Sequence, residues 1–409
     1  MHPFWKYAAA LIPAAAAVIL CGCALTEPIT PYNDEREIEY PEGVLTTTVI
    51  TTTTTDVYTP PDDPGLVKLV GTMTVEEKAA QMMLVGCTDE YAGAEACKNG
   101  AGGLCLFAQP FANKSAEQVR AMTAGFQEAA SIPLLLSVDE EGGTVNRVSL
   151  NPQLRNSIFF SPRYLFEQGG QELIESDAKD KADFLLDLGI NVNLAPVCDV
   201  PLTENDFIYP RCFSTDANET ADYITDVVSI LKQKKLGTTL KHFPGYGGSV
   251  DTHLNMAYDD RAYDVFESRD FLPFSAGIQA GADSVMVSHN IVDCMDSDRP
   301  ASLSPEVQRI LREALGFRGV IISDDLAMNA ITQFTEGRNP AVAAVLAGND
   351  MLCYAEFAQS VEAITAAVQA GEIDEQQLDA SVLRILAWKQ DLGILEVSPA
   401  IDNGLSAQT

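Results

Sequence analysis

The sequence predicts an α/β fold built as a single (β/α)8 barrel of the TIM type, preceded by a signal peptide and a disordered linker. The composition is globular from residue 66 to residue 395, a length that suits one such barrel. Short apolar runs recur through this region, and each is followed by a stretch with helical spacing of apolar residues. Polar side chains end several of these runs, where parallel barrels carry their catalytic groups.

The predicted strands are eight apolar runs, the number that a closed barrel needs. In chain order they are QMMLVGC (81–87), GGLCLFA (102–108), IPLLLSVD (132–139), INVNLAPVCDV (190–200), GTTLKHF (237–243), DSVMVSHN (283–290), GVIISDD (319–325) and NDMLCYA (349–355). Strand count alone does not show closure, so a doubly wound open sheet is the alternative.

Residues that favour helix boundaries lie between these runs. The N-terminal signals are the capping-box pairs Thr74-x-x-Glu77 and Ser115-x-x-Gln118, and Ser304 followed by Pro305. Gly316 is expected to end the helix that Ser304 begins. The segment 375–394 has apolar residues at helical spacing and predicts a helix that packs on the barrel.

The N-terminus predicts a bacterial lipoprotein. Residues 1–22 combine one early lysine, a short Ala-rich apolar stretch and small residues directly before Cys23, which predicts a signal peptide and lipid attachment at Cys23. An ordinary secretory signal is the alternative. Residues 23–65 are rich in Thr, Pro and acidic residues and predict a disordered tether; residues 396–409 form a tail. We therefore expect an extracytoplasmic protein anchored to the cell membrane.

Charge and cysteine usage exclude several classes of protein. The net charge is −32, from 26 basic and 58 acidic residues, which disfavours nucleic acid and anionic lipid headgroups as partners. The membrane link should then be the lipid anchor alone. Besides Cys23, seven cysteines follow the signal peptide without any C-x-x-C spacing, so neither a disulfide framework nor a zinc site is expected. We expect a monomer that needs no cofactor and no metal.

Polar residues end five of the predicted strands. They are Asp139, Asp199, Lys241 with His242, Ser288 with His289, and Asp324 with Asp325. A polar side chain after an apolar strand is costly unless it is paired or used, so their recurrence on one rim predicts an active site.

A glycine-rich segment, KHFPGYGGSVDTH (241–253), contains two of the three histidines that follow the signal peptide. Asp251 precedes His253 by two residues, and a nearby carboxylate can orient an imidazole and stabilise its cation, which makes the pair a candidate proton donor. A surface turn with a solvated histidine is the alternative. If Asp324 attacks an anomeric carbon while this pair protonates the leaving oxygen, the chemistry is retaining glycoside hydrolysis. Charge-assisted hydrogen bonds to sugar hydroxyls can come from Lys241, Arg147 and Arg211.

Four segments in chain order resemble glycoside hydrolase family 3, in its single-domain bacterial β-N-acetylglucosaminidase branch. They are VDEEGGTVNRV (138–148), YPRCF (209–213), KHFPGYGGSVDTH (241–253) and ISDDLAM (322–328). The resemblance implies that Asp324 is the nucleophile, that Asp325 is structural, and that His253, supported by Asp251, is the general acid/base. It implies a sugar subsite of Asp139, Arg147, Arg211, Lys241 and His242, with the carbohydrate, a β-N-acetylglucosaminide, as the partner.

Two positions depart from the family pattern: Tyr246 stands in PGYG where His is usual, and Thr144 follows EGG where Arg is usual. Tyr246 leaves the D-T-H pair intact, so we expect the chemistry to survive, whereas the preference for the N-acetyl group stays open. In the two-domain β-glucosidases of the family a second domain provides the acid; here the histidine loop would carry that role. His289 corresponds to a histidine near the pocket, either structural or functional.

The sequence supports other interpretations less well. A metal site at Asp324 and Asp325 lacks the histidine spacings that metal hydrolases use. Glu140 and Glu141 are expected to accept local hydrogen bonds, and Asp259 and Asp260 to be solvated in a polar turn. A β-glucosidase or a glycoside phosphorylase of the same family stays open, because a histidine acid/base does not repel phosphate. From a different class, a solute-binding lipoprotein of an importer would require two lobes and a hinge.

Overall fold

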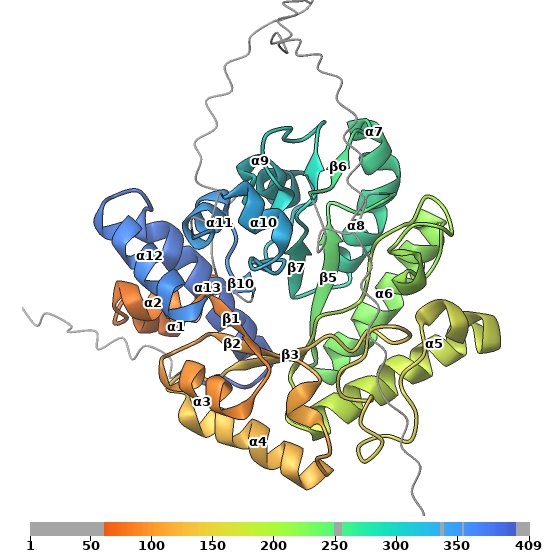
Figure 1. The fold of residues 1–409 in the computed structure, drawn as a ribbon, viewed down its shortest axis with the longest axis horizontal. Coiled ribbons are helices and arrows are strands. Elements are labelled where there is room, and N and C mark those ends of the chain that lie inside the picture. Colours follow the sequence, from red (N-terminus) through yellow and green to blue (C-terminus); the bar gives the residue numbers. More distant parts are fainter. Residues whose placement is uncertain (1–60, 249–255, 336–338, 354–355, 398–409) are drawn as a thin grey trace, which may run out of the picture. The chain divides into compact units, whose positions relative to one another are not determined.

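The computed structural model describes residues 61–248, 256–335, 339–353 and 356–397 (Figure 1). The predicted signal peptide, Cys23 and most of the predicted tether lie outside these residues, and so do Asp251 and His253. Within the described ranges no helix is both long enough and apolar enough to cross a membrane.

Eight parallel strands form the central sheet, in the order β10-β1-β2-β3-β4-β5-β7-β9. They are β1 (Met83–Cys87), β2 (Gly103–Leu106), β3 (Leu135–Val138), β4 (Val192–Asn193), β5 (Gly237–Phe243), β7 (Ser284–Val287), β9 (Val320–Ser323) and β10 (Leu352–Cys353). The two ends of this order meet, because the backbone N–H groups of Asp350 and Met351 donate to the carbonyl of Ile321 over 2.8 and 3.0 Å. The predicted (β/α)8 barrel is confirmed, and the open sheet is excluded.

Helices surround the barrel strands (Figure 1). They are α1 (Pro64–Val70), α2 (Val75–Gln81), α3 (Glu90–Lys98), α4 (Ala116–Ala129), α5 (Pro162–Asp187), α6 (Ala217–Lys234), α7 (Tyr263–Val265), α8 (Phe271–Gln279), α9 (Pro305–Arg309), α10 (Asn329–Phe334), α11 (Ala341–Ala347), α12 (Phe357–Gln369) and α13 (Glu375–Asp391). Each longer helix buries one face. Helix α6, for example, buries Ile224, Val228 and Leu231, three or four residues apart.

The predicted helix boundaries are observed. Thr74 and Ser115 each cap a helix, and in both capping boxes the side chain three residues later bonds back to the cap. Ser304 caps α9 with Pro305 at its first position, and Gly316 has a φ of 70° beyond the following turn of π-helix. The last helix ends at Asp391 rather than residue 394, because Gly393 adopts a φ of 76°.

A second, two-stranded sheet joins the segments that follow β5 and β7. Strand β6 (Tyr258–Asp259) pairs in parallel with β8 (Ile291–Val292). The prediction that Asp259 and Asp260 are both solvated is wrong for Asp259, which is 5% exposed, whereas Asp260 is exposed. Asp259 is buried because Arg261 lies over it and pairs with its carboxylate at 2.7 Å.

Candidate active site

A cavity opens at the C-terminal ends of the barrel strands. Its charged lining is Asp139, Glu141, Arg147, Arg211, Lys241, Asp324 and Asp325, with His242 beside them. Its apolar lining is Phe107, Val145, Leu194, Phe207, Tyr246 and Met286. A sugar ring presents both hydroxyl groups and apolar C–H faces, so a cavity with a charged part and an apolar wall matches its two kinds of surface.

Lys241 and His242 are consecutive residues of β5, yet both line this cavity. Successive side chains of a regular strand point to opposite faces. The pairing of β5 with β7 changes register between Leu240 and Phe243, and such an irregularity redirects a side chain. The barrel thereby presents an ammonium group and an imidazole from adjacent positions.

The centre of the charged part is a buried network around Glu141. Lys241 Nζ lies 2.8 Å from an oxygen of Asp139 and 2.6 Å from one of Glu141. Arg211 binds Glu141 with two hydrogen bonds of 2.9 and 2.8 Å. Burial opposes ionisation of Glu141, but Arg211 and Lys241 outweigh it and lower the pKa of this carboxyl. Burial likewise opposes the charge of Lys241, and Asp139 and Glu141 reverse that effect and raise the pKa of the lysine.

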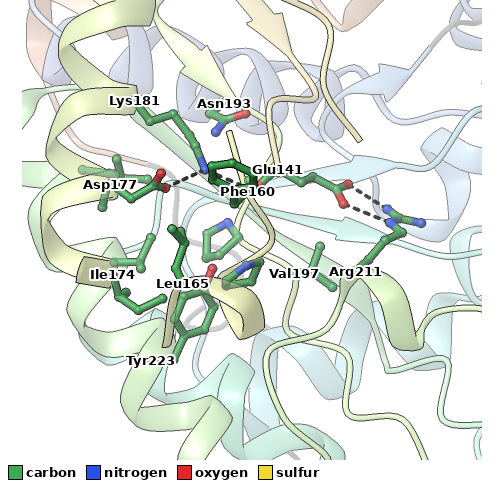
Figure 2. Close-up of a pocket in the computed structure, with 16 residues that line it drawn as sticks. Glu141, Phe160, Leu165, Ile174, Asp177, Lys181, Asn193, Val197, Arg211 and Tyr223 are labelled. Atoms are coloured by element: carbon green, nitrogen blue, oxygen red, sulfur yellow. Dashed lines mark hydrogen bonds and ion pairs between the residues drawn. The ribbon is translucent and has the colours of Figure 1, made fainter. Parts of the chain in front are cut away.

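Glu141 also lines a second, mainly apolar pocket, which lies between α5, α6 and the barrel (Figure 2). Its carboxylate reaches Arg211, while its backbone carbonyl accepts a hydrogen bond of 3.1 Å from Lys181 of α5. Lys181 also pairs with Asp177 at 3.2 Å. Glu141 is therefore held from both sides. The prediction that Glu141 is a local hydrogen-bond acceptor is wrong, because the groups that donate to it, on Lys181, Arg211 and Lys241, come from distant segments of the chain.

The turn that follows Asp139 needs its two glycines. Gly142 and Gly143 have φ values of 102° and 64°, and a Cβ on Gly142 would lie 2.2 Å from the carbonyl oxygen of Phe160. Beyond the turn, the buried carboxylate of Glu140 accepts hydrogen bonds of 2.8 Å from the backbone N–H groups of Arg147 and Val148. Glu140 is thus the local acceptor that was predicted, and it fixes the position of Arg147, whose guanidinium lies 3.7 Å from Asp139.

His242 is oriented by Asp199, which is fully buried. An oxygen of Asp199 lies 2.7 Å from Nδ1 of His242, and the same carboxylate accepts the backbone N–H groups of His242 and Tyr246. Nδ1 therefore carries the proton that faces the carboxylate. Nε2 of His242 therefore accepts a hydrogen bond from the guanidinium of Arg211, 3.1 Å away.

Asp324 follows β9 directly, and its backbone N–H donates to the carbonyl of Val287 at the end of β7. One of its oxygens accepts the N–H of Asp325 over 2.8 Å. His289 is buried behind this pair, with Nε2 2.8 Å from the carbonyl of Asp325 and Nδ1 2.7 Å from the hydroxyl of Ser302. It supports the backbone that presents the two aspartates, which favours the structural role for His289.

Tyr246 is buried and packs edge-on against Phe207 and His242, with ring centroids 5.0 and 5.1 Å apart. In the sequence, Tyr246 is noted only because it departs from the family pattern, and no motif points to Phe207 as a residue of the site. The aromatic wall on this side of the cavity is therefore a feature that the sequence did not predict.

Six of the eight predicted catalytic and sugar-binding residues line one cavity: Asp139, Arg147, Arg211, Lys241, His242 and Asp324. The other two, Asp251 and His253, lie outside the described residues, in the seven-residue segment 249–255. In the part of the chain that the structure describes, no three His, Cys, Asp or Glu side chains are grouped so as to hold a metal ion.

Comparisons with known proteins identify the family of the chain. Residues 74–388 match the model of the glycosyl hydrolase family 3 N-terminal domain. A β-hexosaminidase of Xylella fastidiosa (strain M23) is 37% identical over 236 residues, which cover 56% of this chain and 68% of that protein.

Two solved structures share the fold. A family 3 β-N-acetylglucosaminidase from Paenibacillus sp. str. FPU-7 aligns with a TM-score of 0.74 at 29% identity, and the match covers 83% of this chain and 66% of that chain. A β-N-acetylhexosaminidase from Beutenbergia cavernae DSM 12333 aligns with a TM-score of 0.68 at 27% identity, over 78% of this chain and 99% of that chain. The chain thus belongs to glycosyl hydrolase family 3 and is a glycosidase.

Proposed function

We propose that this glycosidase is a retaining β-N-acetylhexosaminidase that removes terminal, non-reducing β-linked N-acetylglucosamine from peptidoglycan-derived or other extracellular glycans. One observation carries the proposal: the carboxylate-bearing residue Asp324 lines the same cavity as the charged network of Asp139, Glu141, Lys241 and Arg211. The names of the relatives, β-hexosaminidase and β-N-acetylglucosaminidase, support the choice of sugar.

In the proposed first step, an oxygen of Asp324 bonds to the anomeric carbon as the bond from that carbon to the leaving oxygen breaks. His253, protonated and supported by Asp251, gives its proton to that oxygen. In the second step, neutral His253 takes a proton from water, and the water oxygen displaces Asp324 from the anomeric carbon. Two displacements at one carbon return the original β configuration.

The network around Glu141 would bind the hydroxyl groups of the sugar. Asp139 accepts hydrogen bonds, whereas Arg147, Arg211 and Lys241 donate them. His242, with its Nδ1 proton directed at Asp199, presents Nε2 as an acceptor beside Arg211. These groups are already paired before substrate arrives, so little reorganisation is needed on binding.

The deciding experiment measures release of aryl aglycone by the full chain from a β-N-acetylglucosaminide and from a β-glucoside. Asp324→Asn should abolish turnover by removing the nucleophile, and Asp260→Asn, an exposed aspartate, serves as the matched control. Preference for the glucoside would favour a β-glucosidase with a pocket altered at Tyr246. Activity that survives in Asp324→Asn would refute the assignment of the nucleophile.

The acid role of His253 has its own test. His253→Ala should slow the hydrolysis of a phenyl glycoside, a poor leaving group, far more than that of a dinitrophenyl glycoside, because only the poor leaving group needs protonation. Equal losses on both substrates would exclude His253 as the acid.

The location of the enzyme is a separate proposal: a monomer attached to the cell membrane by lipid on Cys23, acting outside the cytoplasm. Its support is the small-residue pattern before Cys23. Labelled palmitate should be incorporated by the full chain and by Cys21→Ala but not by Cys23→Ala. Label that persists in Cys23→Ala would refute the anchor.

A further inference from the structure

Helix α5 carries a lysine on the face that it turns toward the barrel. The residues of α5 that line the pocket in Figure 2 beyond its first turn are Ile174, Asp177, Ala178 and Lys181, which are spaced three or four residues apart and so share one face of the helix. Ile174, Ala178 and Lys181 are 2%, 5% and 9% exposed. A lysine is rarely buried to this extent unless its ammonium group is paired, so its partners indicate what it does.

The ammonium group of Lys181 makes three contacts. It donates a hydrogen bond of 3.1 Å to the backbone carbonyl of Glu141, and it pairs with Asp177 at 3.2 Å (Figure 2). Its Nζ also lies 5.1 Å from the centre of the Phe159 ring. Asp177 is one helical turn away on α5, whereas Glu141 lies 40 residues earlier, in the turn that follows β3. Lys181 thus connects α5 to that turn.

The carboxylate of Glu141, on the other side of the same residue, holds two cations that line the sugar cavity, the one at the C-terminal ends of the strands. It accepts hydrogen bonds of 2.9 and 2.8 Å from Arg211 and lies 2.6 Å from Nζ of Lys241. Arg211 in turn lies 3.1 Å from Nε2 of His242. A displacement of the Glu141 backbone would therefore shift a whole group of buried, paired side chains.

The pocket beside Glu141 leaves room for such a displacement. It contains about 30 Å³ of empty space, and Glu141, Arg211 and Lys181 all line it. One water molecule needs only about 10–15 Å³ of such space, so the packing on this side is not tight. Packing alone leaves Glu141 and Arg211 able to move toward this space, and the hydrogen bond from Lys181 opposes that movement.

We propose that Lys181 is a positioning residue for the sugar-binding cations Arg211 and Lys241, and that it acts through Glu141. This inference rests on the proposed sugar-binding role of those two cations. Lys181 is not among the described residues that line the sugar cavity, so its effect must pass through Glu141. A neutral side chain in its place would release the carbonyl of Glu141 and weaken sugar binding without changing the nucleophile, Asp324.

The test measures sugar binding separately from the chemical step, with the full chain. Lys181→Met keeps an unbranched apolar side chain and removes the ammonium group. We expect the KM for the phenyl β-N-acetylglucosaminide and the inhibition constant of free N-acetylglucosamine to rise together, by roughly 5- to 20-fold, because a hydrogen bond from a charged donor is lost. The kcat should change by less than about 3-fold, as expected when binding is lost equally from the ground state and the transition state.

Lys179→Met is the matched control. Lys179 pairs with Glu175 at 3.2 Å with the same four-residue spacing on α5, but these side chains are 51% and 43% exposed. The control should leave the KM and the inhibition constant unchanged. The double variant Lys181→Met with Asp177→Asn removes the carboxylate that the single variant leaves unpaired, and it decides the question if the single variant does not fold.

Sugar binding that stays weakened in the double variant supports the inference. Sugar binding at the parental level in the double variant, or in folded Lys181→Met, would overturn it, because Lys181 would then contribute to folding alone. Failure of the proposed function is distinguishable from this result. It would appear in the unmodified enzyme as a preference for the β-glucoside, or as activity that survives in Asp324→Asn.

Discussion

The charge of Glu141 is expected to stabilise the barrel as well as the sugar cavity, and Glu141→Gln tests this. The glutamine keeps the size of the side chain but removes the charge that faces Arg211 and Lys241. The side chain of Glu141 is 4% exposed, so water cannot take the place of the lost carboxylate. Removing one partner of a buried ion pair costs about 3–5 kcal/mol.

The structure places the expected loss at the lower end of that range. Lys241 keeps Asp139 as a second partner at 2.8 Å, and the amide oxygen of glutamine can still accept one hydrogen bond from Arg211. We therefore expect the free energy of unfolding to fall by about 3 kcal/mol. Catalysis should weaken too, through a higher KM, because Arg211 loses the group that orients it.

Equilibrium unfolding in urea, followed by circular dichroism, measures the first effect as a lower midpoint at unchanged slope. Glu172→Gln, an exposed glutamate of α5, is the matched control and should stay within about 0.5 kcal/mol of the parent. The double variant Glu141→Gln with Arg211→Met should lose less than the sum of the two single changes, because it leaves no arginine charge unpaired. A loss below about 1 kcal/mol for Glu141→Gln would refute the reasoning.

Three further predictions concern single side chains. Asp199→Ala removes the acceptor of three hydrogen bonds, from the backbone N–H and Nδ1 of His242 and from the backbone N–H of Tyr246. It should lower the free energy of unfolding by more than about 2 kcal/mol and should also lower kcat. An unchanged kcat would show that the orientation of His242 does not matter for catalysis. Gly142→Ala should destabilise by more than about 2 kcal/mol in thermal unfolding, since its φ is 102°, whereas Gly125→Ala, in the open middle of α4, should be neutral or stabilising by up to about 1 kcal/mol. Burial lowers the pKa of Lys389 to about 7, so between there and its ordinary value of 10.5 the unfolded chain binds a proton that the folded chain does not. Stability should rise with pH across that window, by an amount on the order of 4 kcal/mol, and Lys389→Met should flatten the rise; parallel pH profiles for both proteins would contradict this.

The barrel and the position of its site could be predicted from the sequence because both depend on local patterns. An apolar run followed by a polar residue marks the end of a strand, and parallel strands bring all such ends to one rim. Asp139 follows β3, Lys241 lies on β5 and Asp324 follows β9, and the three still meet in one cavity. No knowledge of long-range contacts was needed for that prediction.

The partners of individual charges could not be predicted, because they depend on contacts between distant segments. Glu141 was expected to bond locally, yet it pairs with Arg211, 70 residues further along the chain. Asp259 was expected to be exposed to water. Its ion-pair partner Arg261 is only two residues away in the sequence, so the pairing itself is local, but the burial of the pair is not. What buries the pair is Asp270 and the close approach of Gly245. A spacing in sequence shows which charges can meet but not whether other chain segments enclose them.

The balance of charge in the cavity bears on whether water or phosphate accepts the sugar. Among the described residues that line it, four are carboxylates and three are cations, and each cation lies beside a carboxylate. A phosphate anion would have to compete with those carboxylates for the cations and would be repelled by them, whereas a neutral water molecule is not. We expect inorganic phosphate to leave the rate of aglycone release unchanged and the product to be free sugar, measured by phosphorus NMR of the reaction. A rate that rises with phosphate, together with a sugar-phosphate signal, would show that residues outside the described ranges reverse this balance and that the enzyme is a phosphorylase.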